Sequence, residues 1–163
     1  MLKLQLQMFA RAKNAKRKHE VQDFTGYDEV TGEAVEPTET WLHLAKWVPT
    51  ITDNSTDTTE VGGDYAGDGS PSTEVTAVAE TWTANGTYDA ENPAQKLIVS
   101  KKRDIGDGRK IWHRITMTDG TVYQGVATLT DIRGGSGEAT AYEEFNAVLN
   151  FDNTPELVTP VEG

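Results

Sequence analysis

Apolar and polar residues alternate at the period of a β-strand through most of the segment from Trp41 to Glu156. Because successive side chains of a strand point to opposite faces, this alternation predicts a mainly β fold. The first predicted strand spans Trp41 to Ile51, where Pro49 ends it, and it carries apolar side chains on both faces. We therefore expect both faces of this strand to be covered.

The segment from Thr52 to Glu74 consists largely of Thr, Asp, Gly and Ser, with very few apolar residues. Loops of this length without secondary structure are uncommon in compact domains, and they tend to be functional or disordered. The sequence therefore predicts a long polar loop. The strand pattern returns from Val75 to Tyr88, and Asn85-Gly86 within this run is a turn signal.

One helix interrupts the strand pattern, from Asn92 to about Arg103. Asn92 is a suitable N-cap, and Pro93 stands at the first helical position, where its missing N–H costs nothing. The residues that follow place a narrow apolar stripe on one face: Ala94, Leu97, Ile98 and Lys101. We expect this face to pack on a sheet.

The remaining strands include a hairpin. Lys110–Thr118 is predicted to pair with Thr121–Ile132 across a turn at Asp119-Gly120, a favoured pairing for a type I′ turn. An irregular alternation around Gly125 predicts a bulge in the return strand. A loop at residues 134–137 then precedes a last strand with one apolar face, formed by Phe145, Ala147, Leu149 and Phe151.

The two ends of the chain lack this pattern. Six of the 15 Lys and Arg residues precede Glu20, whereas all 26 Asp and Glu residues lie from Glu20 onwards. We therefore divide the chain into a basic N-terminal arm (1–22), a β domain (23–155) and a C-terminal arm (156–163). Within the domain, Gly26 and Gly32 favour turns, so residues 23–40 are expected to form a loop or a weak hairpin.

Composition narrows the class of protein further. The chain has 163 residues, 36% of them hydrophobic, and this is below the roughly 45–50% of typical globular proteins. Much of the surface is therefore expected to be solvated or to be covered only on assembly. The formal net charge of −11 argues against general binding of nucleic acid. The absence of cysteine excludes disulfides and thiolate zinc sites.

The sequence contains no arrangement that indicates catalysis, a cofactor or a metal. Residues 134–138 resemble a nucleophile elbow, but Glu138 replaces its last glycine. His19, His43 and His113 lack metal-ligand spacing, and His113 is expected in the core or in an interface. The acids of the polar loop lack the spacing of an EF-hand. The tryptophans could stack on sugars, but their strand positions favour the core: Trp41, Trp47, Trp82 and Trp112.

The order of several segments resembles that of the major tail tube proteins of long-tailed (siphovirus-type) bacteriophages. The similarity extends from about Trp41 to Glu156 and lies in segment order rather than in one signature. The segments are Trp41-Leu42-His43-Leu44-Ala45-Lys46 with Ile51-Thr52, Tyr65-Ala66-Gly67-Asp68-Gly69, Asp89 with Asn92-Pro93-Ala94-Gln95-Lys96, Thr118-Asp119-Gly120-Thr121-Val122, Gly134-Gly135-Ser136-Gly137-Glu138-Ala139, and Phe145 to Phe151 with Asn153-Thr154-Pro155-Glu156. The basic arm departs from the pattern, since residues 4–10 look like the start of some phage head proteins.

This resemblance implies a tail-tube-type β-sandwich or barrel with one flanking helix and extended terminal arms. Six copies would close a ring, and rings would stack into the virion tail tube that conducts DNA during genome ejection. The implied partners are other copies of the chain, a tape measure protein, a tail terminator and baseplate or distal tail proteins. DNA would pass through the lumen without specific binding, no membrane is involved, and assembly would take place in the host cytoplasm.

Two sets of residues are expected to make contacts between subunits. The first lies in the polar loop, which could reach a neighbouring subunit or ring: Asp53, Asp57, Glu60, Val61, Asp64, Tyr65 and Asp68. The second lies in the N-terminal arm: Leu2, Leu4, Leu6, Phe9, Arg11, Lys16 and Arg17. The acidic body also suggests a lumen that repels DNA and lets it slide.

Three alternatives remain open at this stage. The chain could be the inner tube of a contractile tail or of a type VI secretion-like system, with the same fold. It could be a monomeric immunoglobulin-like module that binds glycans through its tryptophans. It could also be a head-associated protein whose basic arm binds DNA, with an affinity that falls steeply as salt rises.

Overall fold

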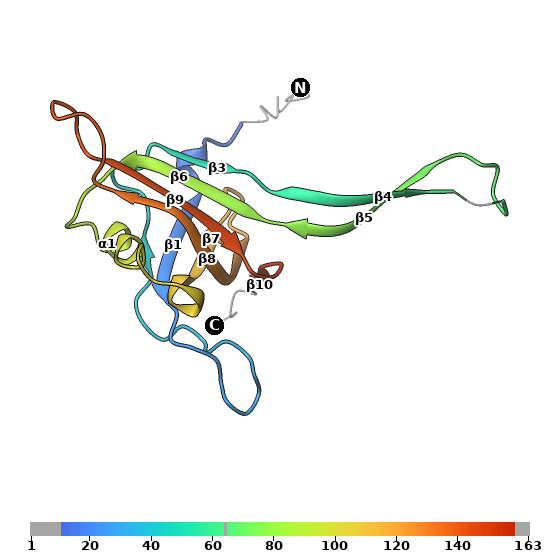
Figure 1. The fold of residues 1–163 in the computed structure, drawn as a ribbon, viewed down its shortest axis with the longest axis horizontal. Helices are drawn as coiled ribbons and strands as arrows, with labels where there is room; N and C mark the ends of the chain where they lie inside the picture. The colour runs from blue at the N-terminus through green and yellow to red at the C-terminus, as the bar shows by residue number, and fades with distance from the viewer. Residues whose placement is uncertain (1–10, 64, 159–163) are drawn as a thin grey trace, which may run out of the picture.

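The strands of the body form one curved antiparallel sheet, a half-barrel (Figure 1). The computed structural model describes residues 11–63 and 65–158. The order across the sheet is β2 (Leu42–His43), β1 (Lys18–Asp23), β7 (Lys110–Thr116), β8 (Val122–Gly134), β9 (Glu144–Phe151), β6 (Thr81–Thr87) and β3 (Thr50–Asp53), and β10 (Glu156–Val158) pairs with β8. The predicted mainly β fold with one flanking helix is therefore confirmed.

The inner face of the sheet holds the hydrophobic core. In β9, Phe145, Ala147, Leu149 and Phe151 are buried, while the residues between them are more exposed. This is the apolar face that the sequence predicted for the last strand. The neighbouring strands add inward side chains to the same cluster, including Trp82, Ala84, Ile111, Ile115, Ala127 and Leu129. The opposite face of the sheet is called the outer face below.

The helix α1 (Pro93–Ser100) covers part of the inner face, where Ala94 and Ile98 are buried in the core. Its N-cap is Asn92, whose side-chain oxygen accepts hydrogen bonds from the backbone N–H groups of Ala94 and Gln95 at 3.1 and 3.3 Å. The predicted helix is confirmed, although it ends at Ser100 rather than Arg103. Two short 3₁₀ helices, η1 (Asn14–Lys16) and η2 (Gly106–Arg109), precede β1 and β7.

The single strand predicted from Trp41 to Ile51 is wrong. Leu42–His43 pairs with β1 at one edge of the sheet, and Thr50–Asp53 pairs with β6 at the other edge. Between them the chain turns at Ala45–Val48, closed by a 3.0 Å hydrogen bond from the Val48 N–H to the Ala45 carbonyl. The apolar residues on both faces of the pattern therefore belong to two edge strands and a turn.

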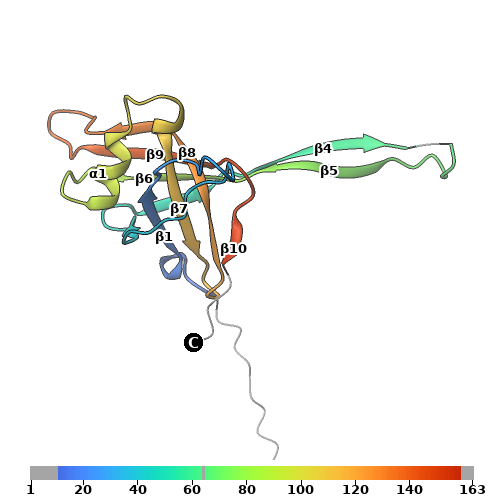
Figure 2. The same ribbon diagram turned by 90° about the horizontal axis from the view of Figure 1, so that it is seen from below.

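The polar loop predicted from Thr52 to Glu74 is also wrong, because most of this segment is a hairpin. β4 (Thr56–Gly62) and β5 (Ser72–Ala79) pair as a separate two-stranded ribbon, in which every residue is exposed. We call this ribbon and its connection, residues 56–79, the arm. Figures 1 and 2 show the arm projecting far from the body. Many of its residues are threonine and valine, whose β-branched side chains favour strands without needing a core.

Two other local predictions, the turn at Asn85-Gly86 and the bulge at Gly125, are wrong. Asn85-Gly86 lies inside β6, paired with β3 on one side and β9 on the other, and forms no turn. Gly125 is in regular register opposite His113, and the irregularity of β8 lies instead between Thr130 and Arg133, where Asp131 has a φ of 48°. By contrast, the hairpin between β7 and β8 forms across Asp119-Gly120 as predicted.

The ends of the domain differ from the predicted arms. Residues 18–22, assigned to the N-terminal arm, form most of β1, which pairs with β2 and β7. Residues 156–158, assigned to the C-terminal arm, pair with β8. Asp23 ends β1, and the segment from 24 to 40 is a loop with one bridge, between Tyr27 and Ala34, in keeping with the expected loop or weak hairpin. Leu2, Leu4, Leu6 and Phe9 lie outside the described residues.

Candidate functional site

The arm has one apolar face. Cross-strand partners share a face, and alternate residues of β4 point the same way, so Asp57, Thr59 and Val61 lie together with Val78, Val75 and Thr73. A shift in register between Thr58 and Thr59 keeps the two valines of β5 on this side. Val61, Val75 and Val78 are 66%, 52% and 55% exposed. We call this surface the valine face. An isolated hairpin is only marginally stable in water, so a partner that covers this face would stabilise the arm.

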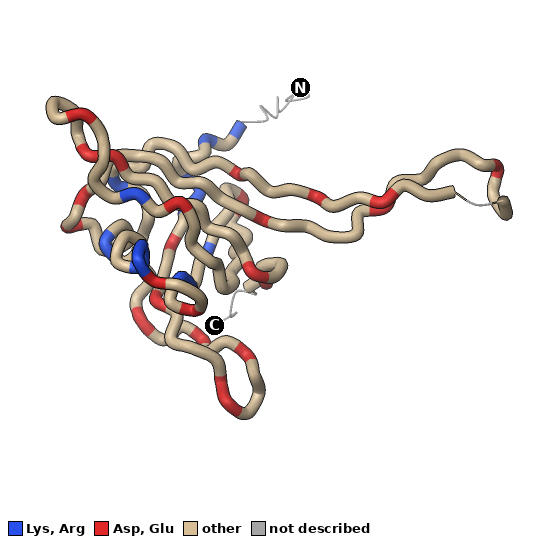
Figure 3. The backbone as a smooth tube through the Cα atoms, viewed as in Figure 1, with Lys and Arg blue, Asp and Glu red and all other residues tan. Residues whose placement is uncertain are grey.

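The opposite face of the arm carries like charges. Glu60 lies directly across from Glu74, an arrangement that is unfavourable in a sheet. The sequence contains no Lys or Arg from residue 47 to residue 95, so no cation within the arm compensates them. Figure 3 shows acidic and no basic positions along the ribbon. The arm is thus an acidic extension whose two strands are fully exposed.

The loop residues predicted to contact other subunits fall along this arm. Asp53 lies at its base in β3, whereas Asp57, Glu60 and Val61 lie in β4. Tyr65 and Asp68 belong to the connection at its tip, and Asp64 lies outside the described residues. Asp68 accepts a 2.8 Å hydrogen bond from the Ser70 N–H, and this bond lowers the pKa of its carboxyl. Sequence reasoning therefore identified the exposed acidic segment but missed its ribbon structure.

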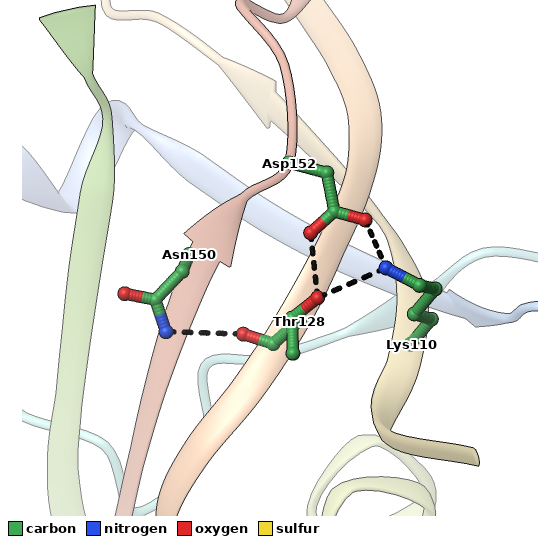
Figure 4. Close-up of polar contacts among 4 residues, drawn as sticks. All are labelled: Lys110, Thr128, Asn150 and Asp152. Atoms are coloured by element: carbon green, nitrogen blue, oxygen red, sulfur yellow. Dashed lines mark hydrogen bonds and ion pairs between the residues drawn. The ribbon is translucent and has the colours of Figure 1, made fainter. Parts of the chain in front are cut away.

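The outer face of the sheet carries a row of polar side chains that crosses four strands. Lys110 Nζ donates to Thr128 Oγ1 at 3.2 Å, and Asn150 Nδ2 donates to the Thr128 carbonyl at 3.1 Å. Thr81 Oγ1 and Asn150 Oδ1 are also hydrogen-bonded, at 3.2 Å. Asp152 closes one end of the row by pairing with Lys110 and accepting from Thr128, as Figure 4 shows. Burial opposes the charge of Lys110, but the contact with Asp152 outweighs it and raises the lysine pKa.

The rest of this outer face is mostly uncharged. Its hydroxyl and amide side chains, beyond those of the row, include Thr50, Thr52, Thr83, Asn85, Gln124, Thr130 and Asn146. The register also places three charged side chains on this face, at the ends of strands: Lys18, Arg133 and Glu144. Arg114 lies on the same face and is neutralised by Glu20, with 3.0 Å between Nη2 and Oε2. The acids lie mainly on the arm and in loops (Figure 3). The outer face therefore presents hydrogen-bonding groups with little net charge.

Two histidines meet in the core although 94 residues separate them. His19 Nδ1 and His113 Nε2 are 3.1 Å apart. His113 is fully buried, which confirms its expected place in the core. No group of three His, Cys, Asp or Glu side chains is placed to hold a metal within residues 11–63 and 65–158. In that same part of the chain, no helix is long and apolar enough to cross a membrane.

The tryptophans have different environments. Trp82 and Trp112 are buried, as the strand pattern predicted. Trp41 lies under the guanidinium of Arg114, whose Cζ is 4.4 Å from the ring centroid. Trp47 is 55% exposed, which contradicts its predicted place in the core. The turn that holds it explains this exposure, because Trp47 is not part of a strand.

The three basic residues predicted to make N-terminal contacts lie in the described part of the chain, but their environments differ. Arg11 and Lys16 are exposed, and Lys16 belongs to η1. Arg17 lies against the body, with its Cζ 5.3 Å from the ring centroid of Trp82. Arg17 is therefore fixed on the domain rather than free in an arm.

Comparisons with known proteins identify the fold but no family. No model of a known protein family matches the chain, and no curated protein sequence matches it. The structure is similar to a chain in the tail of an empty gene transfer agent particle with C6 symmetry, at a TM-score of 0.64 and 10% identity, covering 92% of this chain and 100% of that one.

Two further solved structures share the fold. A chain from the virion of a native gene transfer agent particle matches at a TM-score of 0.57 and 11% identity, covering 92% of this chain and 100% of that one. A chain from the tube-terminating cap of the anti-feeding prophage matches at 0.50 and 14%, covering 91% and 93%. Identities this low establish likeness of fold alone. The chain has a tail-tube-like fold.

Proposed function

We propose that this chain is a structural, non-enzymatic subunit of a tail tube in a phage-like particle, in which six copies close a ring and rings stack into a tube. The observation that carries this proposal is the similarity over 92% of the chain to a chain in a tail with C6 symmetry. The matched particles are a gene transfer agent and the anti-feeding prophage. The narrower assignment to long-tailed bacteriophages stays a prediction.

The arm supports an assembly role, because its valine face and its acidic face are left uncovered in one copy. In the proposed tube, the arm contacts a neighbouring subunit or ring through residues that include Asp57, Val61 and Asp68. Covering three exposed valines removes apolar surface from water, at roughly 25 cal/mol per Å². The exposed Arg11 and Lys16 offer a second contact, with acidic surface on a neighbour.

In the proposed tube, the outer face of the sheet lines the lumen. Two of its cations, Lys110 in the polar row and Arg114, are paired with carboxylates. Lys18 and Arg133 also lie on this face but at opposite ends of the sheet, at the start of β1 and near the end of β8, so they form no cluster that could hold DNA. Unpaired cations are what hold a polyanion. Passage of DNA would then depend on a neutral hydroxyl and amide lining rather than on the acidic lumen suggested by net charge. The same proposal includes the expected partners, which are a tape measure protein, a tail terminator and baseplate or distal tail proteins. It also includes a location in the virion tail and assembly in the host cytoplasm.

Negative-stain electron microscopy of the purified protein over a range of concentrations tests the proposal. Hollow tubes with six-fold end views are expected. Isolated rings that never stack would favour a second candidate, a tube-terminating subunit, because one matched chain belongs to such a cap. Monomers that bind glycans would contradict both and favour the glycan-binding alternative. An inner tube of a contractile or secretion system would also form tubes, so a sheath protein that binds them distinguishes that case.

A further inference from the structure

Trp47 has a backbone conformation that suits glycine. Its φ is 65°, and among the described residues only Asp131 shares a positive φ without being glycine. The left-handed region is strained for a bulky side chain, and such strain concentrates at functional positions. The turn at Ala45–Val48 therefore places a tryptophan where glycine or asparagine would be more stable.

The body of the protein holds Trp47 in this conformation. The Thr87 N–H donates a 2.8 Å hydrogen bond to the Trp47 carbonyl. The close approach of β6 to the Trp47 carbonyl requires a glycine at residue 86, because a Cβ there would lie 2.0 Å from the carbonyl oxygen. Gln95 Nε2 fixes the preceding residue by donating to the Lys46 carbonyl at 3.4 Å. The strained turn is thus built into β6 and α1, and its indole is left 55% exposed.

Trp47 and the arm lie at opposite ends of the same two strands. β3 leads from the turn at Ala45–Val48 to Asp53, which is followed by β4. β6 begins at Thr81, directly after β5, and ends at Thr87, which is bonded to Trp47. Figure 1 shows the arm continuing the line of β3 and β6 away from the body. A contact between the arm of one copy and the Trp47 end of another would therefore join the copies head to tail.

Lysines lie beside Trp47, although the same end of the sheet also carries acids, including Glu144 opposite Thr87. Lys46 Nζ lies 5.7 Å from the ring centroid of Trp47, and the exposed Lys96 belongs to α1, which holds this turn through Gln95. The arm has acids but no Lys or Arg. Asp57 lies on the valine face, directly across from Val78. A carboxylate beside apolar surface on one end thus matches a lysine beside an indole on the other.

We propose that Trp47 is the anchor on which the valine face of a second copy docks, with its indole against Val75 and Val78 and with Lys46 paired to Asp57. This inference rests on the proposed self-assembly and names the surfaces that meet. The contact is heterologous, and heterologous contacts close into rings when the rotation between copies permits. Tryptophan is also one of the residue types enriched among residues that dominate binding energy.

Replacing Trp47 with glycine separates anchoring from folding. The W47G variant keeps a residue that adopts positive φ, so its thermal unfolding temperature should equal or exceed that of the unaltered chain. Its concentration for half-maximal association, measured by sedimentation velocity, should rise at least tenfold. The matched control is Val30→Ala, which truncates a 94% exposed side chain on another loop and should leave association unchanged.

A charge exchange tests the partner. Lys46→Glu and Asp57→Lys should each weaken association, and the two changes together in one chain should restore most of it. If the single changes weaken association and the double variant restores nothing, the pairing of Lys46 with Asp57 is overturned. If W47G associates like the unaltered chain, the docking inference fails while the proposed tube stands. If the unaltered chain never associates, the proposed function fails with it.

Discussion

The imidazoles of His19 and His113 are hydrogen-bonded to each other in the core, with 3.1 Å between Nδ1 and Nε2. His19 also lies against Trp82, and His113 stacks on Phe151, with ring centroids 5.0 Å apart in both cases. The remaining nitrogens, His19 Nε2 and His113 Nδ1, are buried without a hydrogen-bond partner in the described structure. Both rings are therefore held in an environment that disfavours their charged forms.

The first prediction concerns acid stability. Burial, with the charge of Arg17 and the nearby His43, lowers the pKa of His19 to about 4, and burial beside His19 lowers the pKa of His113 well below 6.5. The unfolded chain binds these protons near pH 6.5, whereas the folded chain does not. The free energy of unfolding should therefore fall as pH drops from 6.5 to 4, by about 3 kcal/mol for His19.

Urea denaturation at several pH values between 7.5 and 4 measures this loss. Asp28, Asp68 and Asp119 have carboxyl pKa values below their usual 3.8 because backbone N–H groups donate to them, so their titration lies outside this window. His113→Gln should flatten the pH dependence, because it removes one of the two buried imidazoles. Equal unfolding free energies at pH 7 and pH 4.5 in the unaltered chain would contradict the prediction.

The second prediction concerns Gly86. Alanine at this position would place a Cβ 2.0 Å from the Trp47 carbonyl oxygen and 2.8 Å from the Val48 Cα, both of which are backbone atoms. Relief requires the turn to move, so Gly86→Ala should destabilise the fold by about 2 kcal/mol or more. Gly62→Ala is the matched control, because nothing lies within 4 Å of its added Cβ. Similar unfolding midpoints for the two variants would contradict the prediction, because they would show that the turn at Ala45–Val48 can move away from the added Cβ at little cost in free energy.

The third prediction tests the outer face of the sheet as a lumen. Thr83→Lys adds an unpaired cation to this face without touching the core. Tubes should still form, and they should retain double-stranded DNA at low salt and release it as salt rises. Ser100→Lys puts the same charge on an exposed position of α1, which covers the opposite face of the sheet, and should not produce this retention. Tubes of both variants that bind DNA equally would argue against this lumen.

The fourth prediction removes the arm. β3 and β6 remain paired at its base, where Asp53 faces Trp82 and the Asn54 N–H donates to the Thr81 carbonyl at 2.8 Å. Replacing residues 56–79 with Asn-Gly should therefore close a short hairpin and leave a folded body. Circular dichroism should show cooperative unfolding, and sedimentation should show monomers at all concentrations. Tubes of normal length from this variant would exclude the arm from assembly.

The elements that the sequence predicted correctly depend on neighbours in the chain. The N-cap and proline at Asn92-Pro93 start α1, and Asp119-Gly120 turns the hairpin, because each acts within a few residues. β9 was predictable because one of its faces is fully buried and the other is not. Local signals suffice in these places.

The elements that the sequence missed depend on distant partners. Asn85-Gly86 has turn chemistry, but pairing with β3 and β9 on both sides keeps it extended. β1 looked like part of the basic N-terminal arm because its residues are mostly charged or polar, and nothing in their sequence indicates that they pair with β2 and β7. The arm looked like a loop because neither of its faces is buried, so no apolar alternation marks it.

The candidate site was predictable only in part. The exposed acids Asp57, Glu60 and Asp68 were identified as contact residues, and they lie on the arm. Whether they contact another subunit stays a prediction. The exposure of Trp47 was not predictable, because its apolar neighbours made it look like a core residue. The pairing of His19 with His113 depends on the register between β1 and β7, which no local pattern encodes.

The absence of Lys and Arg between residues 47 and 95 determines which chemical probes can detect the arm. Amine-directed cross-linkers have no lysine to modify there, and trypsin has no site at which to cut. The carboxylates of the arm are the groups through which it can be cross-linked to a lysine. A carbodiimide joins a carboxylate to an amine without a spacer, so it links an arm only to a lysine that the arm touches. In assembled protein, the lysine found in such an amide identifies the surface on which the arm of the neighbouring copy lies.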